Sequence, residues 1–159
     1  MAIITLNNNS LSSVTALPAG VGGKVLQVVQ AKKNSTTNIS GDGAIGLSQS
    51  ITPSSSSNKI LVMVNLDGVT LNTDNDYGQF ELKLSNGTKL RDFAYPYGWN
   101  SNDNGVGTTP SMTWLHEPNT TSQLTYEVHF NSISGTVEVS VNRDEYDQAS
   151  TLTLMEIAG

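Results

Sequence analysis

The chain has 159 residues and a mass of 16.9 kDa, the size of one ordinary domain. Only 14% of the residues are charged, while Ser, Thr, Asn and Gly make up 66 of them, a composition that favours turns and strands over helix interiors. The net charge of −6 lacks the cationic surface that nucleic-acid binding requires, so we exclude that class of partner. The absence of cysteine excludes disulfides, thiolate nucleophiles and Cys-ligated metals.

Residues 1–23 differ from the rest of the chain and are predicted to form an extended N-terminal arm. Ile3, Ile4 and Leu6 make a short β-prone piece, and a stretch rich in glycine separates it from the first strand. Two interpretations stay open: a frayed terminus, or an arm that binds a partner subunit by adding a strand to its sheet. The chain shows neither a secretory leader nor an apolar run long enough for a membrane span, so we expect synthesis in the cytoplasm and no membrane partner.

Residues 24–159 are predicted to form one all-β domain, an antiparallel β-sandwich with the topology of a jelly roll. The apolar residues fall in short segments, often alternating with polar ones, and no segment sustains a helical period over three turns. The predicted strands are Lys24–Gln30, Ile45–Ile51, Lys59–Leu66, Gln79–Leu84, Lys89–Ala94, Ser111–His116, Gln123–Phe130, Thr136–Val141 and Thr151–Ile157.

Three of these segments carry more specific expectations. Lys59–Leu66 is apolar on both faces, which is typical of a central strand. The dipeptide Asn86-Gly87 predicts a tight hairpin turn with positive φ at both residues. Thr136–Val141 is predicted to pair back onto Gln123–Phe130 as the second arm of a hairpin.

The sequence offers little for catalysis. A serine hydrolase brings together a nucleophile, a base and an orienting acid, but the chain has only His116 and His129 and no Gly-x-Ser-x-Gly segment. His129 alternates with Phe130 and is expected to face solvent or a neighbour. We therefore assign no catalytic residue, expect no cofactor and predict that the protein is not an enzyme; a depolymerase that uses Asp144 or Glu145 is the enzymatic alternative.

Acidic side chains in one loop raise the question of a calcium site. Asp74 and Asp76 alternate with other oxygen-bearing side chains, as calcium ligands can. The twelve-residue EF-hand pattern with its closing glutamate is absent, and a polar loop between strands is the favoured interpretation. We assign no metal ligand.

The aromatic residues concentrate in one segment. Phe93, Tyr95, Tyr97 and Trp99 are four of the ten aromatic residues and lie within seven positions. They could cap the core at a strand end, form a subunit interface, or stack on sugar rings. The interface is the preferred functional interpretation, because the segment and the loop after it are almost uncharged.

Several segments together resemble short structural proteins of tailed bacteriophages, especially marine and cyanobacterial ones, which are described as tail-fibre-like or virion proteins. The resemblance covers residues 23–159 and rests on strand and loop motifs that hold no catalytic residues. It implies a place in the virion, a homotrimer, and binding to the major capsid protein or another virion protein. The segments are Gly23–Val29, Ser50–Val62, Glu117–Thr121 and Ser150–Gly159.

Two functions follow from this resemblance. The first is a capsid decoration, or cement, protein that stabilises the head lattice through its N-terminal arm and its subunit interfaces; small size and the absence of a long shaft favour it. The alternative is a tail-fibre or head-fibre protein that binds a receptor, a host surface glycan, through the loops around Tyr95–Thr109.

Overall fold

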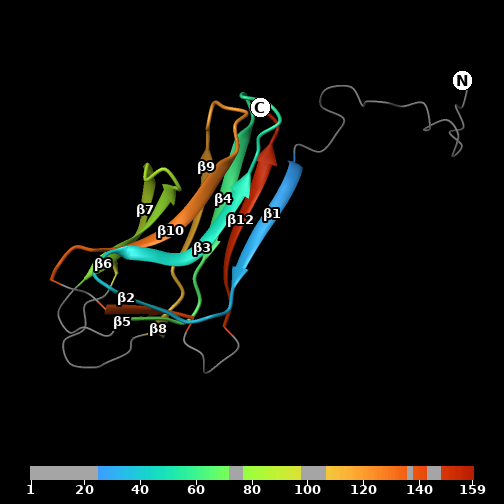
Figure 1. Cartoon of the computed structure of the whole chain (residues 1–159). Coiled ribbons are helices and arrows are strands. Elements are labelled where there is room, and N and C mark those ends of the chain that lie inside the picture. The colour runs from blue at the N-terminus through green and yellow to red at the C-terminus, as the bar shows by residue number, and fades with distance from the viewer. Residues whose placement is uncertain (1–24, 72–76, 98–106, 136–137, 143–147) are drawn as a thin grey trace, which may run out of the picture.

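The structure is a computed structural model that describes residues 25–71, 77–97, 107–135, 138–142 and 148–159. All regular secondary structure in these residues is β-strand (Figure 1). The strands are β1 (Val25–Lys33), β2 (Thr37–Ser40), β3 (Gly43–Ile51), β4 (Lys59–Asn65), β5 (Val69–Leu71), β6 (Gly78–Leu84), β7 (Lys89–Tyr97), β8 (Gly107–Thr108), β9 (Ser111–His116), β10 (Leu124–Ser132), β11 (Glu138–Val141) and β12 (Ser150–Ile157).

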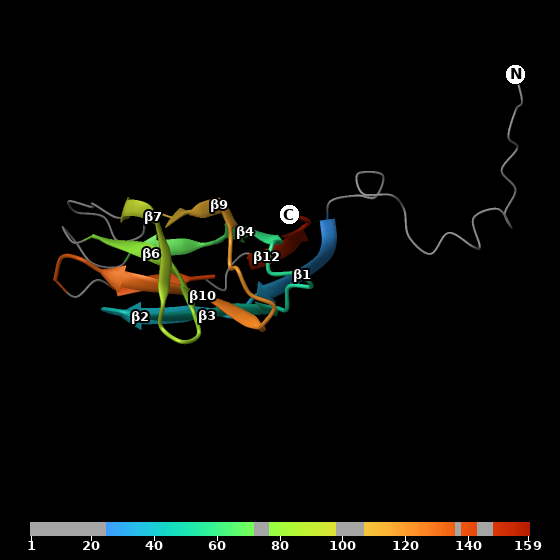
Figure 2. The same cartoon turned by 90° about the horizontal axis from the view of Figure 1, so that it is seen from above.

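Two four-stranded sheets form the sandwich. Sheet A has the strand order β1-β12-β4-β9, sheet C has the order β3-β10-β6-β7, and all their pairings are antiparallel. The sheets stack so that β1 lies beside β3 and β9 lies beside β7 (Figure 2). This interleaving of early and late strands within each sheet is that of a jelly roll, so the predicted fold is confirmed.

A smaller sheet B, of order β2-β11-β5-β8, lies at one end of the sandwich (Figure 1). It corrects one expectation: the strand predicted at Thr136–Val141 is described as β11, and β11 pairs with β2 and β5 instead of β10. The reason is that β10 already has β3 on one side and β6 on the other, so neither of its edges can accept β11.

The hairpin between β6 and β7 corrects a second expectation. Gly87 has a φ of 88°, but Asn86 is not in the left-handed region. The Gly87 amide donates to the Leu84 carbonyl at 2.8 Å, and the Leu84 amide donates to the Thr88 carbonyl at 2.9 Å. The loop is therefore a three-residue turn in which glycine alone takes the left-handed conformation, a geometry that also matches the twist of paired strands.

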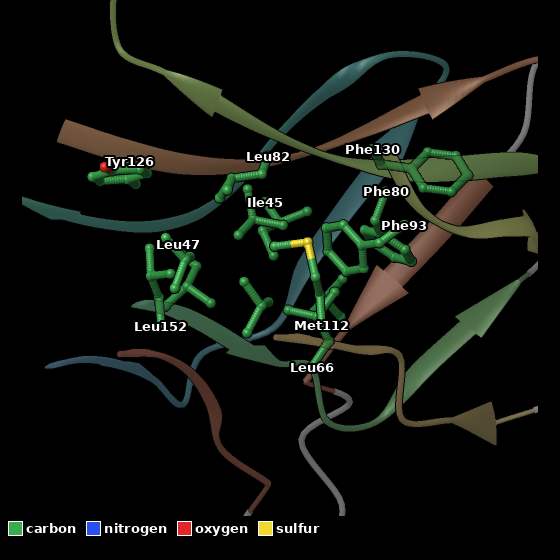
Figure 3. Packing of buried hydrophobic residues seen from close by; sticks show 14 of the residues in the cluster. Ile45, Leu47, Leu66, Phe80, Leu82, Phe93, Met112, Tyr126, Phe130 and Leu152 are labelled. Carbon is green, nitrogen blue, oxygen red and sulfur yellow. The ribbon is translucent and has the colours of Figure 1, made fainter. Parts of the chain in front are cut away.

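The core lies between sheets A and C and is built from alternate residues of each strand. Tyr126 and Val128 are fully buried and Phe130 is 1% exposed, which confirms the inward face predicted for this strand. The rings of Phe80 and Phe130 meet edge to face, with centroids 5.2 Å apart. In Figure 3, the Met112 side chain from sheet A reaches among residues of sheet C.

Candidate interaction surface

Strand β4 shows which side of sheet A faces outward. Ile60 and Val62 are fully buried and Val64 is 2% exposed, so these alternate residues face the core. The residues between them face the opposite side. Since β4 lies between β12 and β9, the prediction of a central strand is confirmed, and its apolar outward residues sit in the middle of the outer face.

One complete row of residues across that outer face is apolar. Leu61 pairs with Met155 of β12 on one side and with Leu115 of β9 on the other. Met155 in turn pairs with Val28 of β1. Because residues that pair directly across antiparallel strands share one face, these four side chains lie next to one another. We name Val28, Met155, Leu61 and Leu115 the apolar row.

The apolar row is exposed at both edges of the sheet. Val28 is 53% exposed and Leu115 is 43% exposed, and Val25 and Leu26 at the start of β1 are each 49% exposed. These are four of the six large hydrophobic residues that are exposed among the described residues. Scattered apolar residues are normal on a surface, but a continuous patch marks a contact with another molecule.

Charged groups lie only at the margins of this surface. Lys59 pairs with Ile157 in the register beyond the apolar row and forms an ion pair with Glu117 at 2.5 Å. Lys32 lies opposite Thr151 at the other end of the face. The row between the apolar row and Lys32 is uncharged and consists of Gln30, Thr153, Met63 and Thr113. The centre of the outer face of sheet A can therefore be covered without burying a charge.

The residues of the predicted aromatic segment lie in different environments. Phe93 is 8% exposed and its ring lies 5.7 Å from that of Phe80, so it belongs to the core and is not available to a partner. Tyr95 is 60% exposed and its ring meets that of Tyr77 edge to face at 6.4 Å. Tyr97 is the last residue of β7, and Trp99 lies outside the described residues.

A second aromatic group, which we did not predict, joins the two sheets near β9. The rings of Trp114 and His116 stack with centroids 5.0 Å apart, and the Arg91 guanidinium lies 6.0 Å from the centre of the Trp114 ring. The His116 Nδ1 and the Tyr126 hydroxyl share a hydrogen bond of 2.7 Å. Burial lowers the pKa of His116 and raises the pKa of Tyr126, so both groups stay neutral near pH 7. This group serves packing between the sheets.

A buried carboxylate closes one end of the sandwich. Glu156 is 1% exposed and accepts hydrogen bonds at 2.6–2.7 Å from Gln27, Asn58 and both the amide and the hydroxyl of Ser54. Burial raises the pKa of the Glu156 carboxyl, but these hydrogen bonds outweigh burial and bring the pKa from the ordinary value of 4.5 to about 2. The signal in the sequence was a glutamate at an inward position, two residues after the buried Leu154.

Other candidate residues from the sequence are not brought together. His129 lies on the outer face of sheet C, as expected, with its Nε2 3.2 Å from Glu127. Among the described residues, no three histidine, aspartate or glutamate side chains come together as a possible metal site. The remaining candidates lie outside the described residues: Ile3, Ile4, Leu6, Asp74, Asp76, Asp144 and Glu145.

One hollow in the described surface, of about 350 Å³, lies between β2 and β11 and is lined by Asn38, Ile39, Ser40, Glu138 and Val139. This hollow is open to solvent and is lined by polar and apolar groups alike, so it does not resemble the enclosed apolar pockets that hold small molecules. In the part of the chain that the structure describes, no helix is long and apolar enough to cross a membrane.

Comparisons with known proteins give distant matches among solved structures alone. No protein-family model matches the chain, and no curated protein matches its sequence. The structure is similar to the VP2 subviral particle of infectious bursal disease virus, with a TM-score of 0.46 and 10% identity over 83% of this chain and 37% of that one. It is also similar to the structure of the Gx strain of that virus, with a TM-score of 0.33 and 12% identity over 84% of this chain. The chain thus spans just over a third of the length of these viral chains.

Proposed function

We propose that the protein is a structural component of a virus particle, and that it acts as a decoration protein on the head of a tailed phage. The observation that carries this proposal is the apolar row, which makes the outer face of sheet A a contact surface for protein. The resemblance to phage virion proteins, given above, supports a tailed phage as the kind of particle. A homotrimer remains part of the proposal, and light scattering that gave the mass of a single 16.9 kDa chain on the particle-free protein would contradict a constitutive trimer.

The mechanism is mechanical. Covering the apolar row removes exposed Val and Leu side chains from water, and each such side chain contributes roughly 1 kcal/mol when half of it is buried by a partner. One contact of this kind is weak, but many copies on a lattice act together, because a capsomer leaves only if several contacts break at once. The scarcity of charge makes such contacts insensitive to salt.

The test uses heads that lack the protein. Adding back the wild-type chain is expected to restore resistance to heat and osmotic shock, with several hundred copies bound per particle. The variant Leu115→Lys places a charge in the apolar row and is expected to bind at least about tenfold more weakly, since an unpaired charge is costly to bury. The variant Ser48→Lys, on the exposed outer face of sheet C, is the matched control and is expected to bind like wild type.

A second candidate function is favoured by Tyr95. This exposed ring, packed edge to face against Tyr77, offers a flat amphipathic surface on which a sugar could stack, as a receptor-binding fibre protein would require. In that case the virion would hold at most a few dozen copies, and purified protein would block adsorption of phage to cells. The variant Tyr95→Ala would then lose the block, whereas Leu115→Lys would keep it.

A further inference from the structure

We expect the apolar row to be covered by another segment of protein. The area of the uncharged surface argues against a second sandwich as the segment that covers it. Four strands about 4.8 Å apart, over the five or six residues per strand that carry no charge, give a surface on the order of 400 Å². A stable interface between two proteins buries about 800 Å² on each side. Two copies that met only through this face would therefore form a weak dimer.

A tethered segment can bind this small surface, because a tether raises the local concentration of the segment and so compensates for the small buried area. A link of about 20 residues, where it is flexible, keeps a segment at roughly millimolar concentration near its own domain and near a neighbour held beside it on the particle. The chain has a segment of this length before β1. When extended, about 20 residues reach as far as about 65 Å, which exceeds the width of the sheet several times.

The composition of this segment matches the surface. Residues 1–23 contain no charged side chain and no histidine, and the apolar residues Ile3, Ile4 and Leu6 lie close together. The central rows of the outer face of sheet A are likewise uncharged. Burying one against the other removes apolar area from water without desolvating an ion.

The segment also joins the domain at the correct place. It leads through Lys24 into β1 at Val25, which pairs with Ile157 on the outer face, next to the apolar row. The register between β1 and β12 then shifts at Val25–Gln27, and the exposed Val25 and Leu26 extend the apolar surface toward the start of the strand. The N-terminal segment therefore joins the domain next to the apolar row.

We propose that residues 3–6 of this chain are the ligand of the apolar row, and that copies of the protein are joined on the particle by placing this segment on the sheet A of a neighbour. The proposal extends the proposed function by naming the partner of that same surface. It differs from strand addition to the free edge of β1, because a segment that crosses the face reaches Leu115 on the opposite edge strand.

Cross-linking tests the proposal on the purified full-length protein. The chain has no native cysteine, so the introduced thiols are the only thiols that the reagent can cross-link. With a short bismaleimide, the double variant Ile4→Cys, Leu115→Cys is expected to cross-link at least about tenfold faster than the control Ile4→Cys, Ser48→Cys. A product of double or triple mass, which places the segment on a neighbour, is the expected result. A product of single-chain mass alone would place the segment on its own sheet and would contradict the joining of neighbours.

Three further results would overturn it. Equal rates for Leu115 and Ser48 would mean that the segment has no preference for the row. Rapid dimers from Leu115→Cys alone would mean that the occupant is a second sheet. Cross-linking of Ile4→Cys to Val28→Cys but not to Leu115→Cys would mean pairing at the β1 edge. All three are measured without virus particles, so they are independent of copy number and of head stability.

Discussion

The outer faces of the two sheets show opposite chemistry on the same scaffold. Sheet A presents the apolar row, with charges confined to its margins. Sheet C presents an ionic network in which Glu81 contacts Lys83 at 2.6 Å and Lys89 at 3.5 Å, while Lys89 also reaches Asp92 at 3.1 Å. A sandwich with solvent on both sides is expected to be polar on both outer faces. Only sheet C meets that expectation, which supports the proposal that sheet A is the side that contacts protein.

The two sheets also differ in how each balances a buried glutamate. Glu81 is 4% exposed and is balanced by two lysines; burial raises its pKa, but the hydrogen bond and charge of Lys83, with help from Gln79 and Lys89, lower it overall. Glu156 of sheet A is balanced by neutral donors from Gln27, Ser54 and Asn58. Salt screens the first arrangement and leaves the second almost unchanged.

The largest effect is expected from Glu156→Ala. This change leaves the donors of Gln27, Ser54 and Asn58 without their acceptor, and should lower the free energy of unfolding by about 3 kcal/mol. Urea unfolding at pH 7 measures it, with Glu156→Gln, which keeps one acceptor oxygen, expected to lose about half as much. The loss should be the same at low and high salt, and a strong salt dependence would contradict neutral stabilisation.

Wild type and Glu156→Ala also differ in how their stability depends on pH. The folded pKa of Glu156 is about 2 and lies below the ordinary value of 4.5. The ionised carboxylate therefore stabilises the fold fully above pH 4.5, and this contribution is lost as the pH falls from 4.5 toward 2. The difference between wild type and Glu156→Ala should shrink over that interval, as measured by urea unfolding.

Most strands of the sandwich could be predicted from the sequence, because the alternation of apolar and polar residues is a local signal. The inward faces of the segments around Phe80 and Tyr126 could be read directly, since each strand has one face in the core. The strands that pair with β11 could not be predicted, because the pairing depends on β3 and β6 occupying both edges of β10. Residues 37–40, 69–71 and 107–108 form short strands of sheet B and were missed, because so few residues show no period.

The interaction surface was harder to predict because it depends on register. Val28, Met155, Leu61 and Leu115 come from four segments of the sequence, and only the pairing of β1, β12, β4 and β9 aligns them. The apolar character of both faces of β4 was the one local sign of it, and we interpreted it as a central strand alone. Glu156 was detectable in principle, as a charge at an inward position of a strand.

A smaller effect is expected on the ionic face. Glu81→Ala removes the shared partner of Lys83 and Lys89 and should lower the free energy of unfolding by about 1.5 kcal/mol at low salt, less than for a fully buried pair because the lysines are partly exposed. At 1 M salt, where the screening length is about 3 Å, the loss should fall clearly. Ser48→Ala, an uncharged change on the same face, is the control and should show no salt dependence. Unchanged loss at high salt would remove the electrostatic distinction between the two sheets.

The smallest effect concerns His116, which lies on sheet A and packs against sheet C. His116 of sheet A is held against Trp114 and Tyr126, and burial lowers its pKa from the ordinary value of 6.5, so the unfolded chain binds a proton more readily than the folded one. Its neutral form stabilises the fold fully above pH 6.5, and that contribution is lost as the pH falls below 6.5, with a slope no steeper than about 1.4 kcal/mol per pH unit for one proton. Urea unfolding between pH 7.5 and pH 5 should therefore show a decline in wild type that His116→Gln flattens. An unchanged decline in His116→Gln would mean that the pH response does not come from the packing between the sheets.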